Sequence, residues 1–358
     1  MSSLFRSFGG SFAFTIVCLG VAFWLGYRDG GAFTAGLATM FTAGMLGILE
    51  VSLSFDNAVV NAKVLAGMNH FWRKMFLTVG VLIAVFGMRV VFPLIIVWAV
   101  DTFSAAEVIR MTWENPARFQ KILADQHVVV AGFGGAFLWM VFTRFFFDHE
   151  KETHWLGLLE RPLSKAGKME AVWVTFTMII SFVFSRYIPP SDTGVAMGPA
   201  FLSASMLGIL VFLMVEGLSS LLGNEEEGDT AGTAVKTAGT AGFAAFAYLE
   251  VLDASFSFDG VIGAFAITNN LFIIALGLGI GAMFVRSLTI KLVEVGTLQT
   301  YTYLEHGAFW AIGALSLIMY LSAAGNHIPE VVSGTVGLAL IAASFVSSVM
   351  LNRRSTQA

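Results

Sequence analysis

Ten long apolar stretches constrain this chain more than any other feature of its sequence. Each has at least 17 residues, long enough for a helix to cross a hydrocarbon core of about 30 Å. They lie at residues 10–27, 35–66, 75–100, 127–147, 171–188, 200–222, 240–265, 270–290, 307–323 and 331–350. Apolar residues make up 57% of the 358, or about 204, close to the roughly 200 that ten spans require. The sequence therefore predicts an all-α, polytopic membrane helix bundle of about ten spans.

The composition excludes several other classes of protein. Only 12% of the residues are charged and the mean hydropathy is +0.79, whereas a soluble domain has about 25% charged residues to solvate its surface. Water-soluble, disordered and nucleic-acid-binding proteins are therefore excluded. Cys18 is the single cysteine, so the chain has no disulfide pair and no cysteine-based metal site.

Positive charge between the spans predicts the orientation. If the N-terminus is cytoplasmic, thirteen Lys and Arg residues lie on the cytoplasmic side and five on the other. Positive charge is retained on the cytoplasmic side of membrane proteins. We therefore expect both termini in the cytoplasm and an even number of spans. The first apolar run lacks a small-residue cleavage site, so we expect an uncleaved helix.

The segments between the spans suggest two unequal repeats. The first, residues 1–222, contains an outer loop at 101–126 and a cytoplasmic loop at 148–170. In the outer loop, a capping box from Ser104 to Glu107 and the pair Asn115-Pro116 predict two short helices. Residues 223–239, acidic and then rich in Gly and Thr, are expected to form a linker. The second repeat is 240–358.

A motif inside the apolar stretches occurs twice. Glu50-Val-Ser-Leu-Ser-Phe-Asp-Asn57 aligns with Asp253-Ala-Ser-Phe-Ser-Phe-Asp-Gly260, and the spacing from Gly80 to Arg89 recurs from Gly277 to Arg286. The motifs lie on the second and seventh spans, so the two helices should cross the membrane in opposite directions. This pattern indicates an inverted repeat, whose ligand site lies near the midplane between the halves.

Five acids lie within these two spans. A charged residue at the centre of a membrane costs about 2.5–3.5 kcal/mol on insertion scales, so each acid requires compensation. One interpretation is ion pairing with Arg89, Arg286 and Lys63, with the remaining acids protonated. The other is an all-oxygen site for a hard cation, built from carboxylates, serine hydroxyls and the Asn57 carbonyl. The acids are Glu50, Asp56, Glu250, Asp253 and Asp259.

Helical spacing places the two motif aspartates apart from the other ligands. At 100° per residue, Glu50, Ser54 and Asn57 share a face, whereas Asp56 lies roughly 120° away. Asp259 is similarly displaced from Asp253 and Ser257. Either the aspartates face a different partner, or both helices unwind near the midplane; we expect unwinding, which would free backbone carbonyls.

At these residues the chain resembles the TerC family of integral membrane proteins, in the LysE transporter superfamily. Glu50-x-x-Leu53-Ser54-x-Asp56-Asn57 matches the first signature of that family. Asp253-x-x-Phe256-x-x-Asp259, followed by Ala266-Ile267-Thr268, matches the second. Gly260, Ile262 and Gly279 depart from the pattern, as in a divergent bacterial branch without assigned function. The resemblance covers both motif helices and the span after each.

The resemblance implies export of a divalent cation, chiefly Mn²⁺, from the cytoplasm of a bacterium across its inner membrane. The implied metal ligands are Glu50, Asp56, Asn57, Asp253, Asp259, Ser54 and Ser257. No cofactor would be bound permanently, and oxygen ligands serve Ca²⁺ and Mg²⁺ as well as Mn²⁺. Glu250 is either a proton-coupling carboxylate or the partner of Arg286; Arg89 is assigned to charge balance with Arg286.

Three functions remain open. The leading hypothesis is a secondary transporter, not an enzyme, whose partners are the metal ion and the lipid bilayer. The first alternative is a membrane adaptor that binds membrane-associated stress proteins, as in tellurite resistance. The second is an intramembrane aspartyl protease with a dyad of Asp56 and Asp259, although its usual Gly-x-Gly-Asp motif is absent.

Overall fold

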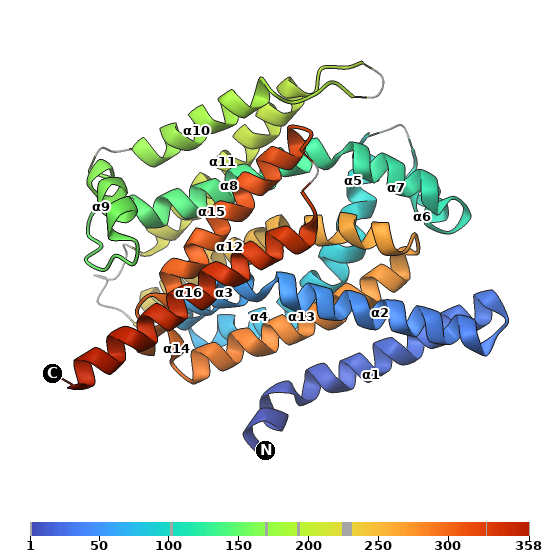
Figure 1. The fold of residues 1–358 in the computed structure, drawn as a ribbon, viewed down its shortest axis with the longest axis horizontal. Coiled ribbons are helices and arrows are strands. Elements are labelled where there is room, and N and C mark those ends of the chain that lie inside the picture. Colours follow the sequence, from blue (N-terminus) through green and yellow to red (C-terminus); the bar gives the residue numbers. More distant parts are fainter. Residues whose placement is uncertain are drawn as a thin grey trace.

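The computed structural model describes residues 2–100, 103–168, 171–191, 194–223, 231–326 and 328–357. Throughout these ranges the regular structure is helical, with no strand. Helices cross the view of Figure 1 from one end of the bundle to the other, with shorter helices across the ends. The predicted all-α polytopic helix bundle is confirmed.

Eight helices or helix runs in the described ranges are long and apolar enough to cross a membrane. They are α1 (Ser2–Gly30), α2 (Phe33–Leu53), the run of α4 (His70–Leu82), η1 (Ile83–Val91) and α5 (Phe92–Val100), α8 (His127–Phe146), α11 (Gly198–Gly223), α13 (Leu271–Glu294), α15 (Leu304–Ala323) and α16 (Glu330–Gln357).

The other two predicted spans are also helical. Helix α10 (Val172–Ser185) is apolar but has only 14 residues, or about 21 Å at 1.5 Å per residue. Helix α12 (Ala231–Ile267) has 37 residues and carries the second motif. Each of the ten predicted stretches is thus helical, and eight of them contain a helix or helix run with the length and composition expected of a span.

The two motif helices differ, which corrects the prediction that both are broken. Helix α2 ends at Leu53 and α3 (Phe55–Gly67) begins after a bend at Ser54. Helix α12 instead continues without interruption through Asp253 and Gly260. The glycines of the second motif permit a break, but a continuous ladder satisfies every backbone group within the helix, as an apolar surrounding favours.

The segments outside the spans follow their capping signals. The capping box of Ser104 and Glu107 starts α6 (Ala105–Glu114), with both of its hydrogen bonds present. Asn115 caps α7 (Pro116–Asp125), with Pro116 in the first turn. The predicted linker is too long, because α12 already begins at Ala231; residues 224–230 lie outside the described residues.

Two ends of the bundle can be distinguished. At one, the α7 end, α7 leads into α8 and the turn between α15 and α16 lies nearby. At the other, the α9 end, α9 (Gly157–Ala166) lies beside the start of α15, with α14 (Thr297–Thr300) also there. In Figure 1, α2 runs from the α7 end towards the α9 end and α12 runs the opposite way, as an inverted repeat requires.

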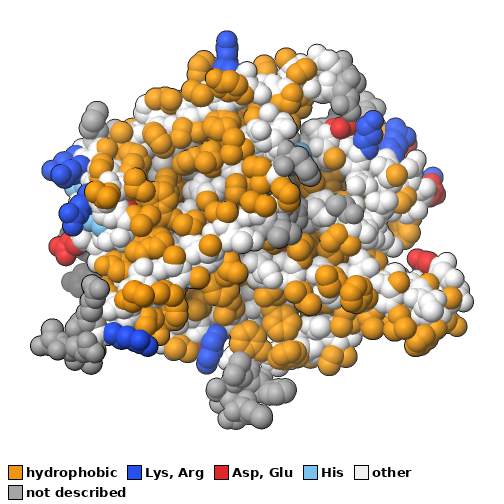
Figure 2. All heavy atoms as spheres, viewed as in Figure 1, with side chains coloured by type: hydrophobic (Ala, Val, Ile, Leu, Met, Phe, Trp, Pro, Cys, Tyr) orange, Lys and Arg blue, Asp and Glu red, His pale blue; other side chains and the backbone are white. Residues whose placement is uncertain are grey.

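Helix α8 forms the centre of the core and is buried over most of its length. It packs against α11 and α15 around large buried side chains such as Phe137, Phe201 and Tyr320. Hydrophobic side chains also cover the outer face of the bundle (Figure 2), where Ile16, Phe41 and Met214 are exposed. An apolar outer surface of this kind is suited to lipid.

Candidate functional site

Two buried acid–arginine pairs lie in the middle of the bundle. Arg89 Nη2 lies 2.5 Å from Glu50 Oε1, and Arg286 Nη2 lies 3.2 Å from Asp253 Oδ2. All four residues are at most 8% exposed. Glu50 and Asp253 are equivalent positions of the repeated motif, and Arg89 and Arg286 are equivalent positions of the following span. The duplication seen in the sequence therefore extends to the ion pairs.

Each arginine is also held by backbone carbonyls. Arg89 lies in η1, a π-helical stretch, and donates to the Ala84 carbonyl. Such a widened turn inside a helix is often found at functional sites. Arg286, on α13, donates to the carbonyls of Phe76 (2.5 Å) and Gly80 (2.8 Å), and its guanidinium carbon lies 3.9 Å from the centre of the Phe76 ring. These hydrogen bonds orient the two guanidinium groups in this arrangement of the helices.

Glycines allow the helices that carry these charges to approach closely. A Cβ on Gly281 of α13 would lie 2.3 Å from Glu50 Cβ, and one on Gly80 of α4 would lie 2.5 Å from Glu250 Oε1. Neither position tolerates a side chain without movement of its neighbours. Close approach through small residues is a common way for membrane helices to pack.

A small cavity lies between the two pairs, and we call it the inner cavity. Its volume is about 20 Å³, enough for one water-sized occupant, which needs about 10–15 Å³. The polar and charged residues that line it come from α2, α3, η1, α12 and α13. They are Glu50, Ser54, Asn57, Asn61, Arg89, Asp253, Ser257 and Arg286.

Several oxygens at the inner cavity lack a hydrogen-bond donor within the described residues. They are Asn57 Oδ1, Asn61 Oδ1 and Ser257 Oγ, all buried. Asn61 does use its amide Nδ2, which donates to Asp253 Oδ1 at 2.8 Å. Arg89 Nε and Arg286 Nε lack a partner as well. Buried polar atoms left without partners are costly, so this cavity favours a polar occupant.

Asp56 lies apart from these pairs, at the start of α3. It is 6% exposed, and its Oδ1 accepts a hydrogen bond from the Asn57 N–H at 3.0 Å. It lines a second, larger cavity of about 690 Å³, the wide cavity, which extends to the α7 end of the bundle. Helical spacing left two arrangements open, and the first motif shows features of both. The helix breaks at Ser54, and Asp56 faces a cavity that Asp253 does not line. Glu50 and Ser54 line both cavities.

The remaining predicted site residues are only partly placed. Glu250 lies 3.6 Å from Arg286 Nη2, which leaves both its proton-coupling role and its role as partner of Arg286 open. Asp259 is on α12, but its side chain lies outside the described residues. Within the described part of the chain, no group of three or more acid, His or Cys side chains has the arrangement of a metal site.

The ion-pair interpretation therefore accounts for some acids and not for others. Glu50, Asp253 and Glu250 each have an arginine within 4 Å. Among the side chains the structure describes, no Lys or Arg lies within ion-pairing distance of Asp56. Lys63, the third candidate base, pairs with Glu305 instead.

The α9 end contains a buried acid that the sequence did not single out. Glu160 of α9 is 1% exposed and accepts hydrogen bonds from His306 Nδ1 (2.9 Å) and Trp310 Nε1 (3.0 Å) of α15. Burial raises its pKa, but these hydrogen bonds and the charge of His306 outweigh burial and hold the pKa at about 2. Glu160 thereby fixes α9 against α15. Nothing in the short sequence of α9 marked it as more than a surface residue.

Aromatic rings and lysines fill the same end. Lys151 Nζ lies 3.3 Å from the centre of the Phe145 ring, which is stacked on Phe309 at 3.8 Å. Lys63, on α3, lies 4.6 Å from the centre of the Phe145 ring and pairs with Glu305 of α15. Burial lowers the pKa of Lys151 to about 8. These contacts cover the end of the bundle opposite to the mouth of the wide cavity.

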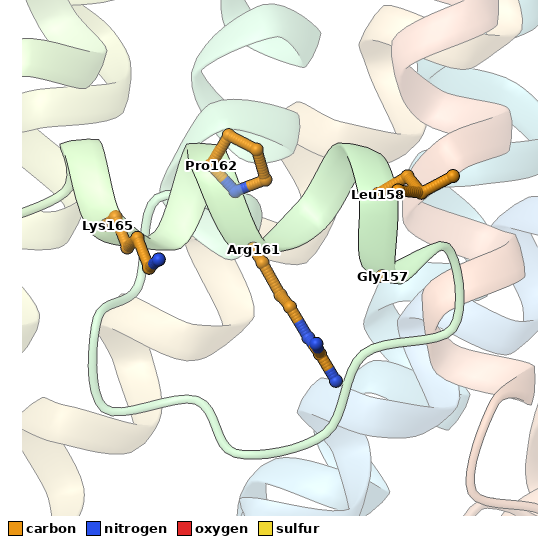
Figure 3. Close-up of a pocket in the computed structure, with 5 residues that line it drawn as sticks. All are labelled: Gly157, Leu158, Arg161, Pro162 and Lys165. Atoms are coloured by element: carbon orange, nitrogen blue, oxygen red, sulfur yellow. The ribbon is translucent and has the colours of Figure 1, made fainter.

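A shallow hollow on α9 lies away from the buried acids. Its lining residues are Gly157, Leu158, Arg161, Pro162 and Lys165 (Figure 3). Arg161 extends across the loop that precedes α9, while Leu158 and Lys165 lie at either end of the helix. With two cationic side chains and no acid, this hollow does not suit a cation.

The fold and site define a multipass α-helical membrane protein with arginine-paired carboxylates at its centre. The chain belongs to the family described as "Protein of unknown function (DUF475)", whose model matches residues 55–355. No curated protein and no solved structure matches the chain. The family match begins after Glu50 and Ser54 and includes Asp56, both arginines and the second motif.

Proposed function

We propose that this protein is a secondary transporter that exports a divalent metal cation, with Glu50 and Asp253 as its central ligands. The inner cavity is the observation that carries the proposal. It brings together two carboxylates and the side-chain oxygens of Asn57, Asn61 and Ser257 in a space for one small occupant. Oxygen donors of this kind are those that Mn²⁺, Mg²⁺ and Ca²⁺ prefer.

The arginines act in this proposal as counter-ions for the empty site. Glu50 and Asp253 carry two negative charges, and Arg89 and Arg286 carry two positive ones, so the site is balanced without a metal. A divalent cation bound between the carboxylates would neutralise their charge in place of the arginines. The guanidinium groups would then turn away from the carboxylates. Exchange of this kind provides two states between which alternating access can switch.

We assign the remaining predicted ligands to positions along the proposed path of the cation. Ser54, at the boundary of the two cavities, passes the cation from the inner cavity to the wide cavity, where Asp56 attracts it. Asn57 and Ser257 complete the inner ligand set. Asp259, the counterpart of Asp56 in the repeat, acts on the other half of the path, and Glu250 takes up the proton or pairs with Arg286.

The sequence is the basis for the proposed direction of transport and for the proposed identity of the cation. The positive charge of the loops assigns the α9 end to the cytoplasm of a bacterial cell, and the resemblance to TerC proteins favours Mn²⁺ export. With this orientation the wide cavity opens to the outer side, while the contacts of Lys63, Lys151 and Glu160 keep the cytoplasmic end closed.

Flux in vesicles tests the proposal. Purified protein is reconstituted into liposomes, and Mn²⁺ uptake is followed with a trapped fluorescent indicator. We expect uptake by the parent, at least a tenfold loss in Glu50→Gln and Asp253→Asn, and no loss in Glu216→Gln, whose acid pairs with Arg144 at the rim of the bundle. No flux in the parent, or undiminished flux in both site variants, would contradict it.

The same vesicles separate transport from the adaptor alternative. An adaptor is favoured by one observation: α9 is fixed to α15 and presents Leu158, which is 93% exposed, beside Arg161 and Lys165. An adaptor would show no flux and would lose its cellular effect on substitution of these α9 residues. The transporter keeps its flux when Leu158 is replaced by Ser.

A further inference from the structure

The wide cavity has features that transport of a bare metal ion does not require. Its volume of about 690 Å³ lies in the range of about 300–1,000 Å³ that is usual for pockets binding small organic molecules. A metal ion with six waters needs about 180 Å³ of this, at roughly 30 Å³ for each water. Most of the space would remain unused.

The lining of the wide cavity is mostly apolar. Side chains of α2, α12, α15 and the turn before α16 form its walls. They include Leu53, Phe256, Ile262, Leu315, Ile318 and Met319. Such walls stabilise an apolar body and disfavour a hydrated ion, because the polar water shell would gain no hydrogen bonds from them.

Among the described side chains, one carboxylate in the wide cavity has no basic partner. The described acids that line the cavity are Glu50 and Asp56, with His127 as a further titratable group, and Glu50 is paired with Arg89 at 2.5 Å. Asp56 has no basic partner among the described side chains. Its carboxylate lies in the first turn of α3, where the Asn57 N–H and the positive end of the helix stabilise negative charge. A single negative charge matches a monocation.

We propose that the wide cavity binds a small organic ammonium ion with an apolar body, which pairs with Asp56. The apolar body lies among Phe256, Ile318 and Met319, which line the cavity. The neighbouring inner cavity, at about 20 Å³, is too small for such a ligand. The two cavities share Glu50 and Ser54, but this proposal concerns the wide cavity alone and does not depend on metal export.

Thermal unfolding of the purified protein tests the proposal with benzylammonium as the probe. We expect a saturable rise of several degrees in Tm with benzylammonium and none with benzyl alcohol, which has the same shape without the charge. Asp56→Asn should abolish the shift, while Asp125→Asn, which removes an exposed acid at the same end, should keep it. Mn²⁺ should compete weakly.

Two further outcomes distinguish the alternatives. If benzyl alcohol raises Tm as much as benzylammonium, or if Asp56→Asn keeps the full shift, the cavity is only an apolar space and the proposal fails. If Asp56→Asn does not fold, Ile318→Trp places a larger side chain where the apolar body would lie and leaves Asp56 in place. Binding of labelled benzylammonium, measured by equilibrium dialysis, should then be lost. Retained binding in Ile318→Trp would also overturn the proposal.

Discussion

At the scale of single residues, the centre of the protein depends on the pairing of buried charges. Glu50 and Arg89 are each almost fully buried, as are Asp253 and Arg286. A buried ion pair contributes little net stability, because desolvation offsets the attraction, but breaking it leaves one charge uncompensated. The two ion pairs thus hold the site in one arrangement. Exchange of a guanidinium group for another cation costs little free energy, because the carboxylate keeps a compensating charge.

A double-mutant cycle tests this pairing. Arg89→Met should destabilise the protein by about 3–5 kcal/mol, because it leaves the Glu50 carboxylate buried without a partner. Adding Glu50→Gln should recover a large part of that loss. The measurement is equilibrium unfolding in detergent followed by circular dichroism. Equal stability of Arg89→Met and the parent would show that Glu50 does not need the arginine.

The Glu160 cluster predicts a pH dependence at the α9 end. The pKa of Glu160 is lowered from 4.5 to about 2, so its stabilising effect is complete above about pH 4.5 and is lost as the pH falls towards 2. Fluorescence of Trp155 and Trp310 should change over this range as α9 separates from α15.

Two variants distinguish Glu160 from general acid unfolding. Glu160→Gln should show the altered fluorescence already at neutral pH and no transition between pH 4.5 and 2. Glu152→Gln, which changes an exposed acid in the preceding loop, should behave as the parent. A parent transition that persists in Glu160→Gln would place the titrating group elsewhere.

At the scale of helices, local signals predicted some elements and not others. The capping box at Ser104 and the Asn115-Pro116 pair predicted α6 and α7, because caps act through neighbouring backbone groups. The break at Ser54 was expected, but the continuity of α12 and the π-helical stretch η1 were not. These last features depend on contacts between distant helices, such as Arg89 with Glu50, which one sequence does not display.

The same contrast holds for the site. The repeat predicted that Glu50 and Asp253 have equivalent places, and both line the inner cavity with their arginines. It did not predict that Asn61 contacts Asp253, whereas helical spacing had left open that Asp56 faces away from the other ligands. Asn61 lies one turn beyond Asn57 on the same helix, and that spacing could have identified it.

Close packing of α2 on α13 gives a prediction at this scale. Gly281→Ala should destabilise the protein by about 1–3 kcal/mol and weaken Mn²⁺ binding, because the added Cβ would lie 2.3 Å from Glu50 Cβ. Gly20→Ala, on α1, places its Cβ in open space and should not lower Tm. The check is thermal unfolding of both variants. A Gly281→Ala protein as stable as the parent would contradict the packing.

At the scale of the whole molecule, the two ends of the bundle differ. The wide cavity extends inward from the α7 end to Asp56 and Glu50, whereas the α9 end is covered by the Glu160 cluster and the stacked rings of Phe145 and Phe309. A transporter open to one side and closed to the other has this form. The proposed orientation makes the open side the outer one.

Cysteine labelling tests that asymmetry. In a Cys18→Ala background, Ser333→Cys at the wide cavity should react with a membrane-impermeant thiol reagent added to intact cells. Ser257→Cys at the inner cavity should not react, because a cavity of about 20 Å³ excludes the reagent. Reaction of Ser333→Cys only in inside-out vesicles would show that the wide cavity opens to the cytoplasm, opposite to the proposed orientation.

The central claim is that Glu50 and Asp253 together hold a divalent cation at the inner cavity. Mn²⁺ binding to the purified protein, measured by electron paramagnetic resonance of the free ion, tests it most directly. We predict one saturable site in the parent, a loss of at least tenfold in affinity in Glu50→Gln and in Asp253→Asn, and unchanged affinity in Glu216→Gln. Mn²⁺ affinity that is the same in the parent and in both site variants would contradict the claim.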